Sequence, residues 1–168
     1  DLFRLRNRIA TEIWNDFATK PYYASKEPKA KSGVTGKVVE VILNNEYRGI
    51  YSLTEAMDRK ELKLKKYDDE NQEFHGQLWK VSSWDKATFW DIDKDYDNTQ
   101  ETWHAFETKY PDIEDVNPTD YSPLYEAIDF VVNSNDETFK EEVGDYFDIS
   151  VLIDYQLFQE TLKPVDNN

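Results

Sequence analysis

The segment VEVILNNEYRGIYSLTEAMDRK, Val39–Lys60, constrains the fold more than any other part of the chain. Its first half has apolar side chains at both alternating positions, which is typical of a strand that is covered on two faces. Asn44 and Asn45 then suit a tight turn with positive φ, because asparagine tolerates that backbone conformation. The sequence therefore predicts a β-hairpin whose first strand, residues 37–43, is buried on both faces.

Helices are predicted on both sides of this hairpin, from apolar residues that recur at a helical period and from capping residues. They cover residues 1–19, 121–133, 135–143 and 148–162. Gly144 is expected to close the third of these helices, and Asp148 is expected to cap the fourth.

A third strand is predicted at residues 76–81, GQLWKV, whereas residues 99–111 fit either a short helix or a strand. This order predicts an α+β fold in which a small antiparallel sheet packs with helices. The sheet-containing lobe is expected at about 1–115, and a helical part, incomplete at its C-terminus, at 116–168.

The chain is acidic and rich in aromatic side chains. Its 168 residues include 35 Asp and Glu against 20 Lys and Arg, for a net charge of −15, with 5 Trp, 11 Tyr and 9 Phe. Disordered acidic chains are poor in aromatic groups, so a folded domain is expected. This charge repels nucleic-acid phosphates, which favours a basic partner, or an anionic ligand bound with a cation, over a nucleic acid.

Several kinds of site are excluded or disfavoured by composition. The absence of cysteine excludes disulfides, thiolate metal sites and a cysteine nucleophile, and a His-rich metal site is unexpected because the only histidines are His75 and His104. No run of about 18 apolar residues occurs, so no membrane-spanning segment is predicted. Because the chain begins directly in a helical pattern, we expect it to be a piece of a longer protein.

The segment DIDKDYDNTQET, residues 91–102, has aspartates at alternate positions, as a calcium-binding loop of twelve residues requires. However, Tyr96 stands where that loop needs glycine, and Thr102 stands where it needs a bidentate acid. The sequence therefore favours a solvated acidic loop over a calcium site.

Two charged features have both a structural and a functional interpretation. The run from Glu55 to Lys60 is explained by a hydrated strand end whose ion pairs are worth about 0–1 kcal/mol each. Lys80 follows two apolar residues in a strand, so its aliphatic stem is predicted to lie against buried surface. A strand lysine also holds nucleotide phosphates in protein kinases, although a single lysine is not a specific signal.

Aromatic residues gather in the middle of the chain and could either stack on a sugar or base or pack internally. They are Trp79, Trp84, Phe89, Trp90 and Trp103. The chain has no G-x-S-x-G elbow and no Walker-type glycine-rich loop, and with 5 Gly it cannot build a typical nucleotide fingerprint.

Five segments, in order along the chain, carry a family resemblance. They are DLFRLRN (1–7), VEVILNNEYRGIYSLTEAMDR (39–59), GQLWK (76–80), FETKYP (106–111) and FDISVLIDYQLFQETLKPVDNN (147–168). The second closely resembles the NGEYxGxYxLTExIDR signature of the CotH family of spore-coat proteins, the CotH-like atypical protein kinases. Asn45 replaces the usual turn glycine of that signature, which is a mild change because asparagine tolerates positive φ.

This resemblance implies an atypical protein-kinase-like fold and the phosphorylation of serine in a protein partner, with ATP and Mg²⁺ as cofactors. It implies that Asp166 is the catalytic residue that orients the substrate hydroxyl. The implied cofactor-binding candidates are Lys80, Glu55, Arg59, Lys109 and Glu107. The metal ligands are unknown, because the family's metal-binding Asn and Asp cannot be located, and the chain as it stands is expected to be inactive.

In this interpretation the hairpin and the third strand form one floor of antiparallel strands, and the hairpin covers the nucleotide. The protein partner is expected to be basic or Ser-rich. An extracellular, cell-surface or spore-coat location follows from where CotH-like proteins are often found. Two other functions stay open: a non-catalytic surface or coat-assembly module that binds through the loop from Trp84 to Trp103, and a carbohydrate-associated surface domain.

Overall fold

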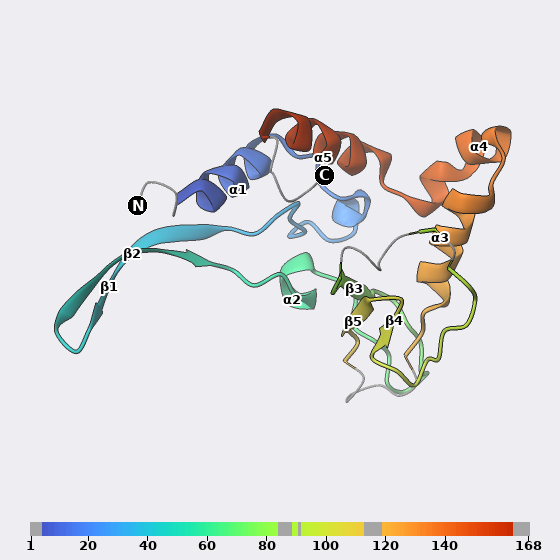
Figure 1. Cartoon of the computed structure of the whole chain (residues 1–168), viewed down its shortest axis with the longest axis horizontal. Coiled ribbons are helices and arrows are strands. Elements are labelled where there is room, and N and C mark those ends of the chain that lie inside the picture. The colour runs from blue at the N-terminus through green and yellow to red at the C-terminus, as the bar shows by residue number, and fades with distance from the viewer. Residues whose placement is uncertain (1–4, 84–88, 91, 113–118, 163–168) are drawn as a thin grey trace. The chain divides into compact units, whose positions relative to one another are not determined.

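The computed structural model describes residues 5–83, 89–90, 92–112 and 119–162. The chain forms two compact units, coloured in chain order in Figure 1. The first unit comprises Asp1–Met57, Glu61–Lys63 and Asp148–Asn168, and the second comprises Asp58–Lys60 and Leu64–Phe147. Helices and two small antiparallel sheets make up the described part, which confirms the α+β class. The expected division into lobes near residue 115 stays a prediction.

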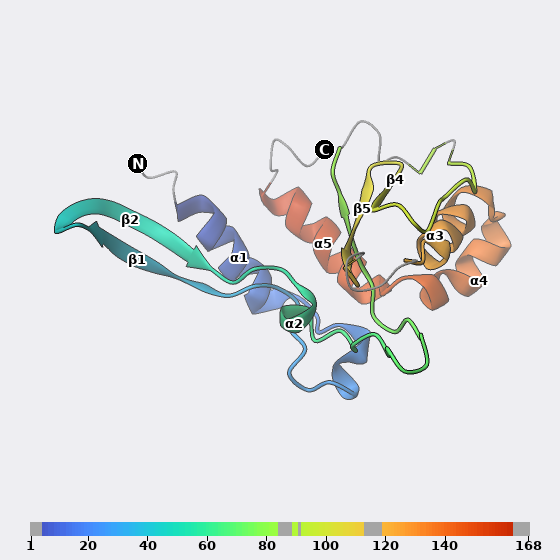
Figure 2. The ribbon, with the colours of Figure 1, turned by 90° about the horizontal axis from the view of Figure 1, so that it is seen from below.

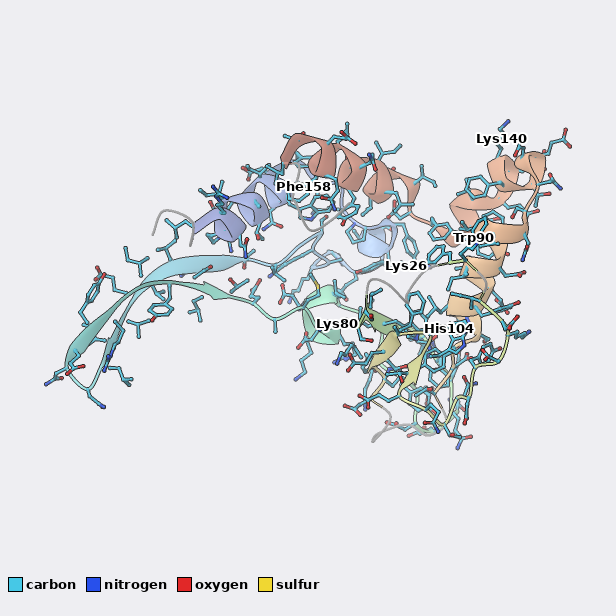
Figure 3. All side chains as sticks on the ribbon, viewed as in Figure 1. Lys26, Lys80, Trp90, His104, Lys140 and Phe158 are labelled. Carbon is cyan, nitrogen blue, oxygen red and sulfur yellow. The ribbon has the colours of Figure 1, made fainter. Side chains whose placement is uncertain are left out.

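The first unit contains two long helices and a hairpin, and aromatic side chains pack between the two helices. Its elements are α1 (Arg6–Phe17), the 3₁₀ helix η2 (Tyr22–Ser25), β1 (Gly36–Leu43), β2 (Glu46–Thr54) and α5 (Ile149–Leu162). Trp14 of α1 meets Phe158 of α5 edge to face at 5.4 Å between ring centroids, and Phe17 stacks on Phe158 at 6.3 Å. Phe158 extends from α5 toward α1 (Figure 3).

The predicted hairpin is confirmed, and its turn has the expected chemistry. Asn44 and Asn45 have φ values of 51° and 62°, the positive pair that a two-residue hairpin turn of the I′ type requires. The strands pair antiparallel from Gly36 opposite Thr54 to Leu43 opposite Glu46, with a register shift between Val41 and Ile42. Gly49 lies at this shift with φ 107°, a conformation that glycine adopts without steric cost.

The prediction that the first hairpin strand is covered on both faces is wrong. Val38 is 50% exposed and Ile42 is 67% exposed, while on the return strand Leu53 is 64% exposed. The reason is that the two strands form a sheet of their own, which extends beyond α1 as a ribbon (Figure 2). Apolar residues at both alternating positions therefore reflect strand propensity here and not double burial in the described part of the chain.

The second unit has its own sheet, and this overturns the expected floor of three strands. Its strands are β3 (Leu78–Val81), β4 (Thr102–Trp103) and β5 (Phe106–Tyr110), in the order β3-β5-β4. The third predicted strand thus pairs with β5 and not with the hairpin. The ambiguous region 99–111 contains two strands and no helix in the structure.

Aromatic side chains form the core of the second unit. Trp103, Phe106, Tyr121 and Ile128 are its buried members, and Tyr96 packs against them. The hydroxyl of fully buried Tyr121 donates to the carbonyl oxygen of Glu101 at 2.6 Å, which ties the start of α3 to the strand region. Because strands and helix share this core, the face of the sheet opposite to it is left for polar groups.

The helices of the C-terminal third agree with the sequence except at one end. They are α3 (Ser122–Asn133), α4 (Asp136–Tyr146) and α5. Asn135 caps α4 by accepting from the backbone N–H groups of Glu137 and Thr138, each at 3.0 Å. Asp148 caps α5 as predicted, because its Oδ1 accepts from the Val151 N–H at 3.3 Å. Gly144, in contrast, does not end α4 but lies inside it.

A short helix, α2 (Arg59–Leu62), follows the hairpin, and its residues are divided between the two units. The stretch that follows it, residues 63–76, contains no helix or strand, only one isolated antiparallel bridge between Asp68 and Glu73. None of the described helices is both long enough and apolar enough to cross a bilayer.

Candidate functional site

The first unit contains a cluster of one lysine between two carboxylates. Lys31 Nζ lies 3.1 Å from Glu55 Oε1 and 2.5 Å from Glu61 Oε1. Glu55 also accepts from Thr35, at 2.7 Å from the backbone N–H and 2.6 Å from the hydroxyl, both to Oε2. This arrangement fixes the loop before β1 to the end of β2, because the loop supplies the donors and Glu55 follows β2 directly.

The hydrogen bonds of this cluster favour its charged state. They lower the pKa of Glu55 from 4.5 to about 2, chiefly through Thr35 and then through Lys31. The pKa of Lys31 is raised, mainly by its hydrogen bond to Glu61 and next by that to Glu55. Both changes favour the charged form, so at neutral pH Lys31 is positive and Glu55 is negative, each with a side chain that is a little over a third exposed.

A largely apolar cavity of about 420 Å³ lies in the same unit. Residues from α1, the loop before β1, the segment after β2 and α5 line it: Asn7, Ala10, Thr11, Trp14, Ser32, Gly33, Val34, Met57, Tyr155 and Phe158. Cavities of a few hundred cubic ångströms with apolar and aromatic walls are typical of small-molecule sites. Asn7 belongs to the DLFRLRN segment that suggested the family resemblance.

The cavity and the charged cluster are built from the same two stretches of chain. Ser32, Gly33 and Val34 line the cavity, and Lys31 and Thr35 of the cluster are their neighbours in sequence. On the other side Met57 lines the cavity two residues after Glu55. An apolar cavity whose lining residues adjoin a lysine and a carboxylate in sequence can receive a ligand with a flat apolar part and a charged part.

Hydrogen bonds from α1 hold the lining loop in place. Trp14 Nε1 donates to the Ser32 carbonyl oxygen at 2.7 Å, and Asn15 Nδ2 donates to the Val34 carbonyl oxygen at 2.9 Å. Gly33 between them lies so close to α1 that an added Cβ would meet Asn15 Oδ1 at 2.6 Å and Trp14 Cδ1 at 2.7 Å. The shape of this wall of the cavity therefore depends on a glycine.

Three of the sequence-predicted site residues come together on the sheet of the second unit. Lys80 of β3 is registered opposite Glu107 of β5, so their side chains lie on one face. Glu107 also forms an ion pair with Lys109 on the same strand. Lys80 is exposed on the face of the sheet that also carries Glu107, and the expectation that its aliphatic stem lies against buried surface stays a prediction. The role of these three residues in cofactor binding stays a prediction.

The other predicted site residues lie elsewhere. Arg59, in the second unit, donates from Nη1 to the Leu64 carbonyl oxygen at 3.0 Å, and its guanidinium carbon lies 5.4 Å from the centroid of the Tyr110 ring. These contacts give Arg59 a structural role, and its role in cofactor binding stays a prediction. Glu55 is in the first unit, in the lysine cluster. Asp166, the predicted catalytic residue, lies outside the residues that the structure describes.

A group of possible metal ligands lies in the irregular stretch of the second unit. Single ligand atoms of Asp68, Glu73 and His75 all lie within 4.8 Å of one another. Asp68, however, already accepts three hydrogen bonds from the turn at residues 70–71, and Lys65 Nζ is 3.5 Å from His75 Nδ1. These contacts explain the group as a turn stabilised by local polar contacts.

Two aspartates of the acidic loop and the core residue Trp103 have structural roles. Asp95 accepts from Trp103 Nε1 at 3.0 Å, and Asp97 accepts from both the backbone and the hydroxyl of Thr99. These bonds agree with the preference for a non-calcium loop, although Asp91 lies outside the described residues. Trp103 is core, while Trp90 is 76% exposed. Trp84 also lies outside the described residues.

Sequence reasoning missed Lys31 and Glu61. Lys31 belongs to a loop with several lysines, and nothing local distinguishes it from Lys26 or Lys29. Its partners are 24 and 30 residues away, so only the fold brings them together. The available signal was the hairpin itself, since its strand pairing returns the residues after β2 to the loop before β1.

Comparisons with known proteins agree with the resemblance. No curated protein and no solved structure gives a significant match. A family model described as CotH kinase protein matches residues 1–168, the whole chain. The match covers the hairpin, the lysine cluster, the cavity and the sheet of the second unit alike, and the chain therefore belongs to the CotH kinase family.

Proposed function

We propose that this domain belongs to a kinase that transfers the γ-phosphoryl group of ATP, with Mg²⁺, to serine in a protein partner. The observation that supports the proposal best is the cavity of the first unit beside the Lys31 cluster, in a chain matched along its whole length by the kinase family model. Phosphoryl transfer needs positioning and charge neutralisation rather than a covalent intermediate. The cavity suits the positioning of a nucleotide, and Lys31 suits the neutralisation of phosphate charge.

The residues present fit a nucleotide. Aromatic rings of Trp14, Tyr155 and Phe158 line the cavity, and such rings stack favourably on a purine base. Lys31 supplies a cation for phosphate oxygens, and Glu55 and Glu61 supply the carboxylate oxygens that Mg²⁺ prefers. When bound, Mg²⁺ would neutralise phosphate charge that an acidic protein otherwise repels.

Two lysines compete for the role of phosphate anchor. Lys31 is held by two carboxylates in the first unit, whereas Lys80 stands opposite Glu107 on the sheet of the second unit. Lys31 has the cavity beside it, which favours it as the anchor. Replacing each lysine by methionine separates the two possibilities, because methionine keeps the length of the side chain and removes its charge.

The predicted role of Asp166 provides the test of catalysis. The full-length protein that contains this domain is incubated with γ-labelled ATP, Mg²⁺ and a basic, serine-rich protein substrate, and phosphoserine is then measured. We expect label on serine from the unaltered protein, and a loss of at least about a hundredfold in Asp166→Asn, in line with the size of general-base effects. Equal labelling by Asp166→Asn, or labelling that survives removal of Mg²⁺ by a chelator, would contradict the proposal.

A second candidate function is a non-catalytic surface or coat-assembly module. Exposed aromatic and aliphatic side chains favour it, notably Trp90 at 76% and Ile42 at 67% exposure, because exposed apolar groups of this kind mark many binding surfaces. In either case we propose an extracellular, cell-surface or spore-coat location. Protease treatment of intact cells or spores tests the location, since only an external protein is cleaved.

A further inference from the structure

A second, smaller cavity lies in the second unit, between α3 and the residues Phe89 and Ile92. Its volume is about 180 Å³. Ile92, Ile128 and Val132 give it apolar walls, and Phe89 and Tyr125 give it aromatic rings. A cavity of about 150 Å³ can hold a benzene molecule, so by volume a ligand of five or six heavy atoms fits here, beside both apolar and polar lining groups.

The one charged side chain that lines this cavity among the described residues is the carboxylate of Asp129. Asp129 lines it together with Asn133, and Asp129 is half-buried. Asn133 Nδ2 donates to Asp129 Oδ1 at 2.8 Å, and the Tyr125 hydroxyl donates to the same oxygen at 3.4 Å. Both bonds use Oδ1, and among the described residues no hydrogen bond or ion pair reaches Oδ2. A half-buried carboxylate with one oxygen available favours a cationic donor as its ligand.

The structure already contains a cation at the ring of this cavity. Lys94 Nζ lies 5.4 Å from the centroid of the Tyr125 ring, within the range of a cation–π contact. Burial, and after it the charge of Asp129, raises the pKa of Tyr125, which favours the protonated hydroxyl that donates to Asp129. The net charge of −15 for the whole chain adds a long-range attraction for positive groups.

We propose that this cavity binds the side chain of a lysine from a protein partner, with the methylene groups against Ile92, Ile128 and Val132 and the ammonium on Asp129 Oδ2. An alkylammonium matches both parts of the cavity, because its four methylenes need apolar walls and its charge needs the carboxylate and the aromatic ring. The cavity proposed for the nucleotide is lined by residues of the first unit, and this one by residues of the second. The lysine-binding proposal can therefore be tested independently of the proposed phosphoryl transfer.

The test uses n-butylammonium chloride as the probe, because this ion reproduces the lysine side chain. It is titrated into the ¹⁵N-labelled protein, and the amide signals of Ile92, Tyr125 and Ile128 are followed by NMR. We expect saturable shifts at these residues, and about fivefold weaker binding in Asp129→Asn, a loss of the size that one partly exposed charge pair produces. Glu141→Gln in exposed α4 removes the same charge outside the cavity and should bind like the unaltered protein.

A neutral probe separates charge recognition from apolar filling. n-Butanol has the same chain without the cation, and we expect it to bind more weakly than butylammonium. The proposal is overturned if butanol binds as tightly as butylammonium, if Asp129→Asn binds the cation unchanged, or if the shifts lie elsewhere in the chain. Amide spectra of the two variants recorded without probe show whether each keeps the fold.

Discussion

Lys31 Nζ lies 3.1 Å from Glu55 Oε1, although 24 positions of sequence separate the two residues. The hairpin makes this contact, because β2 runs back along β1 and brings Glu55 to the loop in which Lys31 lies. Thr35 completes the arrangement by donating twice to Glu55. The feature that defines the fold of the first unit thus also assembles its most polar site.

The first prediction concerns the pH dependence of stability. The folded-state pKa of Glu55 is about 2, below its ordinary 4.5, so the fold favours the charged carboxylate. The stabilising contribution of Glu55 is therefore complete above pH 4.5 and is lost as the pH falls toward 2. Urea unfolding from pH 7 to pH 2 should show that Glu55→Gln is less stable than the unaltered protein at pH 7, with a difference that shrinks across this window.

Glu40→Gln is the matched control for this experiment, because Glu40 is exposed on β1 and its side chain makes no hydrogen bond or ion pair in the described part of the chain. It should show no comparable change with pH. A constant difference between Glu55→Gln and the unaltered protein over the whole range would mean that the Glu55 carboxylate is not held by the fold.

A second prediction contrasts two glycines. An added Cβ at Gly36 would lie 2.5 Å from the Leu53 carbonyl oxygen and 2.5 Å from Arg8 Nη1, whereas one at Gly144 would meet nothing within 4 Å. Gly36→Ala should therefore destabilise the protein by about 1–3 kcal/mol through overpacking against backbone. Gly144→Ala, inside α4, should stabilise it by about 0.5–1 kcal/mol through helix propensity. Chemical denaturation measures both, and destabilisation by Gly144→Ala would contradict its place within the helix.

A third prediction concerns the core of the second unit. Tyr121 is fully buried, and its hydroxyl donates to the Glu101 carbonyl oxygen. Tyr121→Phe should cost about 1–2 kcal/mol of unfolding free energy, because a buried acceptor loses its donor. Tyr146→Phe is the control: its ring stacks on Phe130 but is 43% exposed, so its loss of a hydroxyl should change stability by less than about 0.5 kcal/mol. Equal effects of the two substitutions would count against the assigned bond.

The sequence predicted those features that depend on neighbouring residues. The positive-φ turn at Asn44 and Asn45 and the cap at Asp148 are local, and both are confirmed. The features it failed to predict depend on pairing between distant segments. The apolar residues of β1 do not reveal which element covers them, and the pairing of β3 with β5 cannot be read from GQLWKV alone.

Some residues of the candidate site could be identified from the sequence, and others only from the structure. The family resemblance pointed to Glu55, and the structure places it in a charged cluster. Lys31 was not predicted, because it is one of several lysines in its loop and belongs to no periodic pattern and no motif. Lys80, Glu107 and Lys109 were singled out separately, and the strand register brings them to one face, which only the pairing of β3 and β5 could establish.

The central claim is that the cavity of the first unit and the Lys31 cluster bind a nucleotide, and calorimetric titration with Mg-ATP tests it most directly. We predict saturable binding to the unaltered protein, about tenfold weaker binding to Lys31→Met, which is roughly 1.4 kcal/mol, and unchanged binding to Lys29→Met in the same loop. Circular dichroism shows that each variant is folded. Absence of Mg-ATP binding to the unaltered protein, or equal affinity in folded Lys31→Met, would contradict the claim.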